Sequence, residues 1–351
     1  MSARGAEHAP SATTEGDARG GAAGAPAPLL AVSDLRVDFH TAGRHVRAVD
    51  GLSYHVERGR TVAMIGESGC GKTVSSRALM ALLPRTAHVR GSILFEGREL
   101  VGLREARMRE VRGASIAMVF QDPTRSLNPT MRVGDQIVEA VRAHRSESRA
   151  GARERALELM RLVRLPAAAE RFDQYPHQLS GGMRQRVMIA IAIASEPKLL
   201  IADEATTALD VTTQAQIMEL LREIQDRLGM ALIMISHDLG LAATFADEVL
   251  VMYAGRAVER APTRKLFEQV RMPYTRALID SIPRLEDPPH MELNVVAGQA
   301  PNLASLPPGC PFAPRCPRAT DRCREQNPPF EEQEPDHAWA CWHPYGSEDD
   351  R

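Results

Sequence analysis

The chain has 351 residues and a formal net charge of -2, from 43 basic and 45 acidic side chains. This balance gives no compositional case for nucleic-acid binding, which draws on a basic excess. The sequence has no apolar run near the ~18 residues needed to cross a bilayer, and no secretory pattern at its start. We therefore expect a protein made and kept in the cytosol, with one large domain and a smaller appendage.

Residues 1–28 are rich in Ala, Gly, Ser, Thr and Pro and contain no aromatic side chain. Such a segment has too little apolar surface to offset the entropy of ordering, so we expect a disordered leader. Residues 30–39 and 47–56 have the pattern of half-buried strands and are separated by a polar turn. They predict an antiparallel sheet that leads into the core.

Three later runs are short and apolar on both sides, which predicts buried parallel strands at residues 61–65, 199–202 and 231–235. Helical patterns, such as that of residues 213–228, lie between these runs. Strands that alternate with helices predict an α/β fold.

The segment from 121 to 180 is mostly amphipathic helix, for example over 139–165. It predicts a helical subdomain at about 122–180. Beyond residue 261 the pattern weakens and prolines multiply. We therefore place the main domain at 29–262 and an irregular C-terminal extension at 263–351.

A glycine-rich loop follows the first buried strand and has the sequence Gly66-Glu-Ser-Gly-Cys-Gly-Lys72-Thr73. A strand, this loop and a helix in succession predict a phosphate-binding P-loop. Glycines let backbone N–H groups converge on phosphate, Lys72 reaches the outer phosphates, and the Thr73 hydroxyl holds Mg²⁺. With three lysines among 43 basic residues, a chance match is on the order of 10⁻³. We expect ATP to be held by Gly66, Ser68, Gly69, Cys70, Gly71, Lys72, Thr73 and Val74.

A second acidic strand end completes the predicted phosphate chemistry. Four apolar residues precede Asp203 and Glu204. We expect Asp203 to bind Mg²⁺ at the strand tip and Glu204 to orient and activate the attacking water. Taken alone, an Asp-Glu pair at a strand end would be interpreted as an ordinary surface pair. Within the glycine-rich loop, we expect Cys70 to be a small residue at a variable position rather than a redox switch. The P-loop upstream favours the catalytic interpretation of the carboxylates.

Residues 179–186, Leu-Ser-Gly-Gly-Met-Arg-Gln-Arg, resemble the signature motif of ATP-binding-cassette (ABC) proteins. The resemblance implies a RecA-like α/β core with an antiparallel β-subdomain and a helical subdomain. It also implies that the signature of one subunit closes over the nucleotide of another, which concerns Ser180, Gly181, Gly182, Gln185 and the later Asp210. A Ser-Gly-Gly that opens a helix over 183–194 offers N–H groups to an anion, or is simply a helix cap.

Other positions resemble further motifs of that family. The resemblance implies that Gln121 senses Mg²⁺ and the membrane subunit, that residues 208–210 form the D-loop, and that His237 contacts the γ-phosphate. Adenine would stack on Phe39, with His40 and Tyr54 as rivals, unless Phe39 packs in the sheet.

The closest resemblance, over about residues 29–345, is to the ATPase subunits of oligopeptide and dipeptide importers, of the type called D. It is carried by residues 174–186, 206–211, 252–256 and 281–284 and by the cysteine-bearing tail. It implies a peripheral protein at the cytoplasmic face of the cell membrane, with a second related ATPase, two transmembrane permease subunits and an extracytoplasmic binding protein. Ala205 departs from the proline usual in the family, which loosens that turn.

Two other functions compete with this one. A soluble ABC ATPase acting on ribosomes or DNA would have two cassettes or a long coiled coil, and this chain shows one cassette and no sustained heptad. A regulatory cassette without catalysis would lack Lys72, Asp203, Glu204 or His237. Among importers, the solute stays open between dipeptides, longer peptides, and nickel or another small solute.

Four of the five cysteines crowd near the C-terminus, at Cys310, Cys316, Cys323 and Cys341. Four thiolates suit a 4Fe–4S cluster or structural zinc, and unligated thiols are the alternative. Spacings of five, six and seventeen residues lack the tight Cys-x-x-Cys of zinc sites. Together with the importer resemblance, these spacings favour the iron–sulfur cluster.

Overall fold

The protein is built around an eight-stranded sheet with the strand order β11-β12-β10-β9-β3-β8-β7-β6. A computed structural model describes residues 27–41, 44–206, 210–282 and 296–346. The expected leader and residues 208 and 209 of the expected D-loop lie outside these ranges, apart from residues 27 and 28. The parallel part of the sheet contains β3 (Thr61–Ile65), β6 (Ile116–Val119), β7 (Leu199–Asp203), β8 (Ala231–Ser236) and β9 (Glu248–Tyr253). The predicted α/β fold and its buried parallel strands are confirmed.

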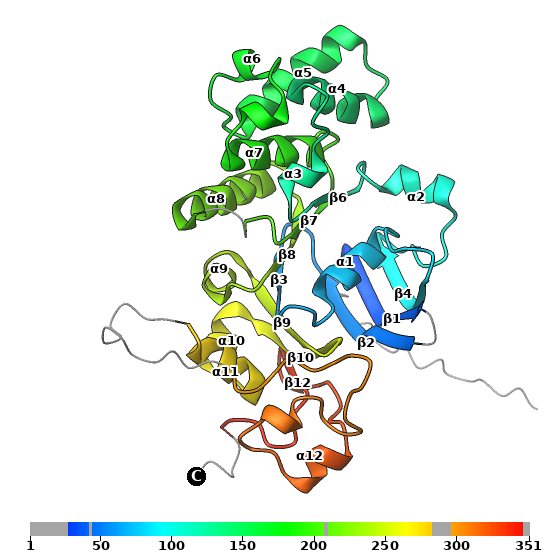
Figure 1. Cartoon of the computed structure of the whole chain (residues 1–351), viewed down its shortest axis with the longest axis vertical. Coiled ribbons are helices and arrows are strands. Elements are labelled where there is room, and N and C mark those ends of the chain that lie inside the picture. The colour runs from blue at the N-terminus through cyan, green and yellow to red at the C-terminus, as the bar shows by residue number, and fades with distance from the viewer. Residues whose placement is uncertain (1–26, 42–43, 207–209, 283–295, 347–351) are drawn as a thin grey trace, which may run out of the picture.

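A second, four-stranded antiparallel sheet lies beside the first, together with helix α1 (Lys72–Leu79) and helix α2 (Glu105–Val111) (Figure 1). The predicted pairing of the first two strands is confirmed, with Leu30 opposite Val56. The strands, in the order β2-β1-β4-β5, are β1 (Leu30–Thr41), β2 (Arg44–Val56), β4 (Ala87–Phe95) and β5 (Arg98–Glu99).

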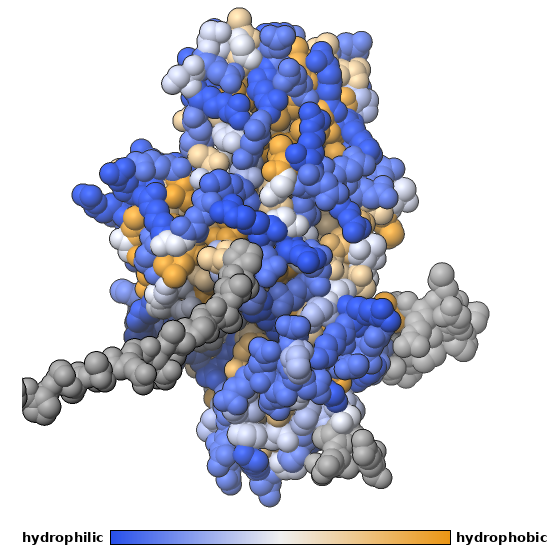
Figure 2. All heavy atoms as spheres, turned by 180° about the vertical axis from the view of Figure 1, so that it is seen from behind, coloured by the Kyte–Doolittle hydropathy of each residue, from blue (hydrophilic) through white to orange (hydrophobic). Residues whose placement is uncertain are grey.

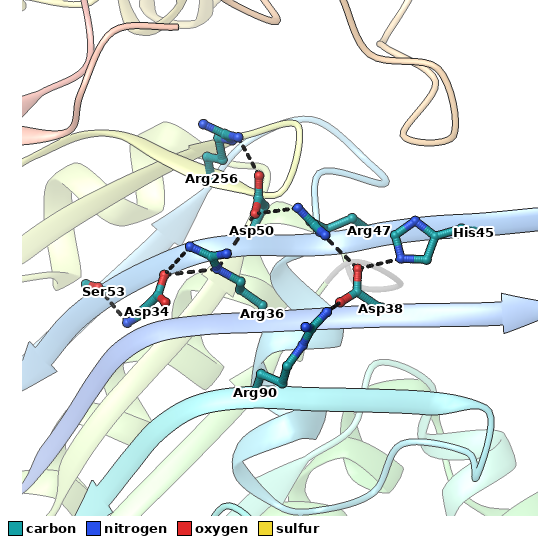
Figure 3. A network of polar contacts seen from close by, with 9 residues as sticks. All are labelled: Asp34, Arg36, Asp38, His45, Arg47, Asp50, Ser53, Arg90 and Arg256. Atoms are coloured by element: carbon teal, nitrogen blue, oxygen red, sulfur yellow. Dashed lines mark hydrogen bonds and ion pairs between the residues drawn. The ribbon is translucent and has the colours of Figure 1, made fainter. Parts of the chain in front are cut away.

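A buried carboxylate ties three strands of this smaller sheet together (Figure 3). Asp38 on β1 has no exposed side-chain surface and accepts hydrogen bonds from Arg47 at 2.9 Å and Arg90 at 2.6 Å. His45 lies 2.9 Å from the same carboxylate. Burial alone would raise the pKa of Asp38, but the two arginines outweigh burial and lower this pKa to about 2.

Replacing Asp38 with Asn should therefore destabilise the protein by about 1–2 kcal/mol at pH 7, a value discounted for the solvent exposure of both arginines. The folded-state pKa is below the unfolded value, so this stabilisation is present above pH ~4 and is lost as the pH falls towards 2. Urea unfolding between pH 7 and 2.5 would measure it. The exposed Asp34→Asn variant is the control and should change stability by less than about 0.5 kcal/mol. An equal effect of both variants would contradict the assignment.

The helical subdomain lies at one end of the central sheet (Figure 1). Its helices are α3 (Pro123–Ser126), α4 (Val133–His144), α5 (Arg149–Leu162), α6 (Ala168–Arg171), a 3₁₀ turn (Pro176–Gln178) and α7 (Gly181–Ala192). The helical pattern expected over 139–165 is interrupted, because the chain becomes extended at Arg145 and the Ser148 side chain accepts the Gly151 N–H to start α5. On the face shown in Figure 2, hydrophobic residues are visible among hydrophilic ones in the helical subdomain at the top.

The C-terminal extension lies at the opposite end of the molecule (Figure 1). It was expected to be irregular, yet it adds β12 (His337–Trp339) and β11 (Glu331–Glu334) to the central sheet, next to β10 (Arg256–Pro262). A fully buried pair fastens this addition, with His337 2.9 Å from Glu259. Short helices precede it: α10 (Thr263–Glu268), α11 (Pro273–Asp280), the 3₁₀ turn Ala313–Arg315 and α12 (Asp321–Glu325).

Two further helices, α8 (Val211–Leu228) and α9 (Leu239–Phe245), connect strands of the central sheet. The expected helix over 213–228 is thus present. Among the described residues, no helix is both long and apolar enough to cross a membrane.

Candidate functional site

The loop between β3 and α1 has a backbone that requires glycine at both ends. A Cβ at Gly66 would lie 2.3 Å from the Met252 carbonyl oxygen, and one at Gly71 would lie 2.5 Å from the Ala48 carbonyl oxygen. Gly71 also has a φ of 103° and starts α1. The N–H groups at the start of α1 are therefore free of side-chain caps and available to an anion.

Lys72 folds back over this loop. Its Nζ donates to the carbonyl oxygens of Gly66 at 2.6 Å and Glu67 at 3.0 Å, and the side chain is almost fully buried. Ser68 and Gly69 are exposed on the loop, and Val74 is half-buried in the first turn of α1. This arrangement holds the ammonium where phosphate oxygens can replace carbonyl oxygens as its partners.

Cys70 is buried within the loop, with 5% of its surface exposed. Burial raises the pKa of its thiol, which opposes formation of the reactive thiolate. These observations favour the interpretation of Cys70 as a small packing residue.

Two expected Mg²⁺ ligands lie together beside the loop. The Thr73 hydroxyl donates to Asp203 at 3.0 Å, and Asp203 is the last residue of β7. Burial raises the pKa of Asp203 above its usual value, and the hydrogen bond from Thr73 offsets only part of this increase. A hydroxyl and a carboxylate are oxygen ligands of the kind that Mg²⁺ prefers, so these residues fit the ion.

The three predicted catalytic side chains converge from adjacent strand ends. Gln121, Glu204 and His237 follow β6, β7 and β8. The Gln121 amide nitrogen lies 2.5 Å from one Glu204 oxygen, and the His237 ring nitrogen Nδ1 lies 4.0 Å from the other. Glu204 has a φ of 47°, and its N–H donates to the Ile235 carbonyl at 3.0 Å. This left-handed backbone turns the carboxylate out of the strand, where it can act as a general base.

The signature residues lie at the start of α7. The exposed Ser180 caps this helix and accepts the Met183 N–H at 3.3 Å, and Gly181 and Gly182 form its first turn. Gln185 is 1% exposed. Burial in the single chain does not test a contact with another subunit's nucleotide, so that role of Gln185 stays a prediction.

The two remaining expected ATP contacts have local structural roles. Asp210 is exposed and caps α8 by accepting the Thr213 N–H at 2.9 Å. Phe39 is half-buried on β1 and packs against the core beneath the smaller sheet. Neither observation tests a contact with nucleotide.

Sequence reasoning missed the residues that hold the loop from its other side. The Arg315 guanidinium donates to both carboxylate oxygens of Glu67, at 2.7 and 2.8 Å. The Tyr274 hydroxyl accepts the Glu67 N–H at 2.9 Å. In the sequence, Arg315 stands out only by its position beside Cys316. No local pattern connects Arg315 to Glu67, which is 248 residues away.

The four C-terminal cysteines line one small cavity, together with Met272 and Trp342. Burial raises the thiol pKa of Cys310, Cys316 and Cys341, in the last case to about 12. Among the described residues, no three His, Cys, Asp or Glu side chains are placed to hold a metal ion. The metal centre stays a prediction.

A P-loop, a strand ending in Asp-Glu and a helix opened by Ser-Gly-Gly, on a mixed sheet with a helical subdomain, define an ATPase of the ABC class. The family model "ABC transporter" matches residues 49–207, and the model "Oligopeptide/dipeptide transporter, C-terminal region" matches residues 258–323. The ATP-binding cassette MJ0796, bound to ADP and Pi, shares the fold with a TM-score of 0.61 at 24% identity, over 67% of this chain and 99% of that one. The cbiO1 protein of Clostridium perfringens, part of the complex cbiONQ, has a TM-score of 0.58 at 29% identity, over 69% of this chain and 91% of its own.

Curated relatives narrow the class. A probable peptide ABC transporter ATP-binding protein of Sinorhizobium fredii is 50% identical, over 90% of this chain and 94% of its own. The dipeptide transport ATP-binding protein DppD of Bacillus subtilis is 48% identical over the same shares. The chain belongs to the family of ATP-binding proteins of oligopeptide and dipeptide ABC transporters. It spans about half the length, 52%, of another relative, the oligopeptide transport ATP-binding protein OppD of Mycobacterium tuberculosis, which is 50% identical over 90% of this chain.

Proposed function

We propose that this chain binds and hydrolyses ATP as a motor subunit that powers peptide import through an ABC transporter. The observation that carries the proposal is the convergence of Gln121, Glu204 and His237 beside the Thr73 and Asp203 pair. All five lie at the carboxyl ends of neighbouring strands or at the start of α1, where a nucleotide on the P-loop would place its phosphates.

Each residue has a distinct task in hydrolysis. Lys72 and the N–H groups at the start of α1 bind the outer phosphates. Thr73 and Asp203 would hold Mg²⁺, with Gln121 as a further expected ligand, and the bound ion would neutralise charge that develops on the phosphates. Glu204 orients the attacking water and accepts its proton, while Gln121 and His237 fix the carboxylate and the γ-phosphate side of the site.

The proposed assembly pairs this chain with a second related ATPase beneath two transmembrane permease subunits. The names of the relatives support the transporter context. Ser180, Gly181, Gly182 and Asp210 would face the partner's nucleotide, and exposure of Ser180 and Asp210 agrees with this role. The exposed Phe120 precedes Gln121, so motion of Gln121 would reach the surface there. The chain would lie at the cytoplasmic face of the cell membrane, and an extracytoplasmic protein would deliver solute.

Reconstitution with the partner ATPase, permeases and binding protein tests the proposal. Labelled dipeptides and longer peptides should accumulate in proteoliposomes in an ATP-dependent manner, and nickel should not. The matched control is an assembly that carries Asp203→Asn, which removes the carboxylate expected to hold Mg²⁺. ATP-dependent nickel uptake without peptide uptake would replace peptide import with the alternative solute.

We also infer that Cys310, Cys316, Cys323 and Cys341 bind a 4Fe–4S cluster, with zinc as the alternative. Support comes from the single cavity that all four line. Four thiolates are the ligand set of a 4Fe–4S cluster. The raised thiol pKa values imply that cluster binding would release protons.

Anaerobically purified protein should contain about four irons and four sulfides per chain. Cys323→Ser should lose the iron, whereas Cys70→Ser, which lies outside the cavity, should retain it. A colourless protein with stoichiometric zinc would replace the cluster with zinc, and absence of any metal would reject the centre.

A further inference from the structure

We propose that Arg315 of the C-terminal extension is a positioning residue for the ATP-binding loop and acts through Glu67. The inference deepens the proposed ATPase function and rests on it. No family motif named above includes an arginine at this position, and Arg315 touches neither the catalytic carboxylate nor the expected Mg²⁺ ligands.

The contact between the two residues has the geometry of a strong ion pair. Arg315 donates from both terminal nitrogens to the two Glu67 oxygens, at 2.7 and 2.8 Å. The side chains are 6% and 24% exposed. A bidentate pair that is shielded from water fixes direction as well as distance. The carboxylate of Glu67 therefore has one strongly preferred position.

The extension itself holds Arg315 rigidly. Its guanidinium also donates to the Ala297 carbonyl at 2.6 Å, the Val296 carbonyl at 3.2 Å and the Tyr253 hydroxyl at 3.2 Å. These contacts occupy the donor face of the guanidinium. An arginine with this many partners would have to give up several hydrogen bonds at once to swing away from Glu67.

A cluster of three aromatic side chains also holds Glu67 in position. Tyr253, Tyr274 and Phe312 pack ring against ring, with centroids 4.6 to 5.3 Å apart. Tyr274 accepts the Glu67 N–H at 2.9 Å. The cluster thus joins strand β9, helix α11 and the cysteine-rich segment to the loop. Glu67 is held at both its backbone and its side chain.

The contacts of Glu67 with Arg315 and Tyr274 determine which backbone groups of the loop would face a nucleotide. The Glu67 N–H is turned towards Tyr274, and the Glu67 carbonyl accepts from Lys72 at 3.0 Å. Because Glu67 is fixed, the loop after it begins in a single conformation. The N–H groups at the start of α1 then remain available to bind the phosphates. A loop that is already in its binding conformation loses less entropy when ATP binds. Removing Arg315 should weaken ATP binding without touching the groups that perform hydrolysis.

Equilibrium binding of a fluorescent ATP analogue to the purified full chain tests the inference. We expect Arg315→Ala and Glu67→Gln each to raise Kd about tenfold, since directly contacting residues couple at this scale. The Kd of the double variant should not exceed the higher of the two single-variant Kd values, because both substitutions remove the same contact. Arg315→Lys keeps the charge but not the bidentate geometry, and should fall between wild type and Arg315→Ala.

The matched control is Arg324→Ala, on α12 of the same extension, where the arginine pairs with the exposed Asp321 at 2.7 Å. Its Kd should equal that of wild type. In the assembled transporter, Arg315→Ala should raise the KM for ATP and leave kcat within about twofold, because Glu204 is untouched.

Three results would overturn the inference. The first is an unchanged Kd in Arg315→Ala, even with a lower melting temperature, since the pair would then only fasten the extension. The second is additive losses in the double variant, and the third is tighter ATP binding. Should Arg315→Ala fail to fold, Arg315→Lys and Glu67→Gln carry the same test. Failure of wild type to bind the analogue would instead contradict the proposed ATPase function.

Discussion

Replacing Glu204 with Gln should lower the rate of ATP hydrolysis by about 10²–10⁴-fold, the usual contribution of a positioned general base. ATP affinity should change little. The amide has nearly the same shape as the carboxylate and still reaches Gln121, which lies 2.5 Å away. It cannot accept a proton from water, so the chemical step alone is lost.

Steady-state phosphate release with the partner subunits present measures the rate, and binding of a fluorescent ATP analogue measures the affinity. The partner's catalytic site must be disabled, so that all turnover arises at the site of this chain. Lys72→Ala provides the opposite signature, because loss of the buried ammonium should weaken nucleotide binding itself. Near-normal turnover at a Glu204→Gln site would show that another group is the base.

The second large effect concerns assembly. The isolated chain should hydrolyse ATP at least about 10²-fold more slowly than the assembled transporter, as expected when donors to the transition state are missing. In the proposed arrangement, Ser180 and Gly182 at the start of α7 contact the nucleotide that is bound to the other subunit. A monomer has no partner to supply these groups to its own P-loop.

A crossed design isolates this contribution. In an assembly that carries Glu204→Gln here and an intact partner site, Ser180→Ala should reduce the remaining turnover while ATP affinity at Lys72 stays constant. Ser126→Ala, on the short helix α3, is the control and should have no such effect. Analytical ultracentrifugation must accompany the assays. Full turnover by a strict monomer would refute the composite sites.

The sequence by itself determined those features that depend on neighbours along the chain. The P-loop was evident because glycines and Lys72 stand directly between a buried strand and a helix. The ends of β7 and β8 were predicted closely enough to bring Glu204 and His237 to one edge of the sheet, and the family resemblance implied a place for Gln121 in the same site. Parallel strands align their carboxyl ends, so local strand patterns suffice to predict this edge.

The tertiary structure decided the features that depend on packing between distant segments. Burial of Gln185 follows from how α7 packs in the core, and the register of β12 on β10 joins residues such as Glu259 and Trp339. The grip of Arg315 on Glu67 crosses 248 residues. A local pattern predicts the period and polarity of one element, whereas the packing of the whole chain determines which surfaces contact each other. This packing places the C-terminal extension against the ATP-binding loop.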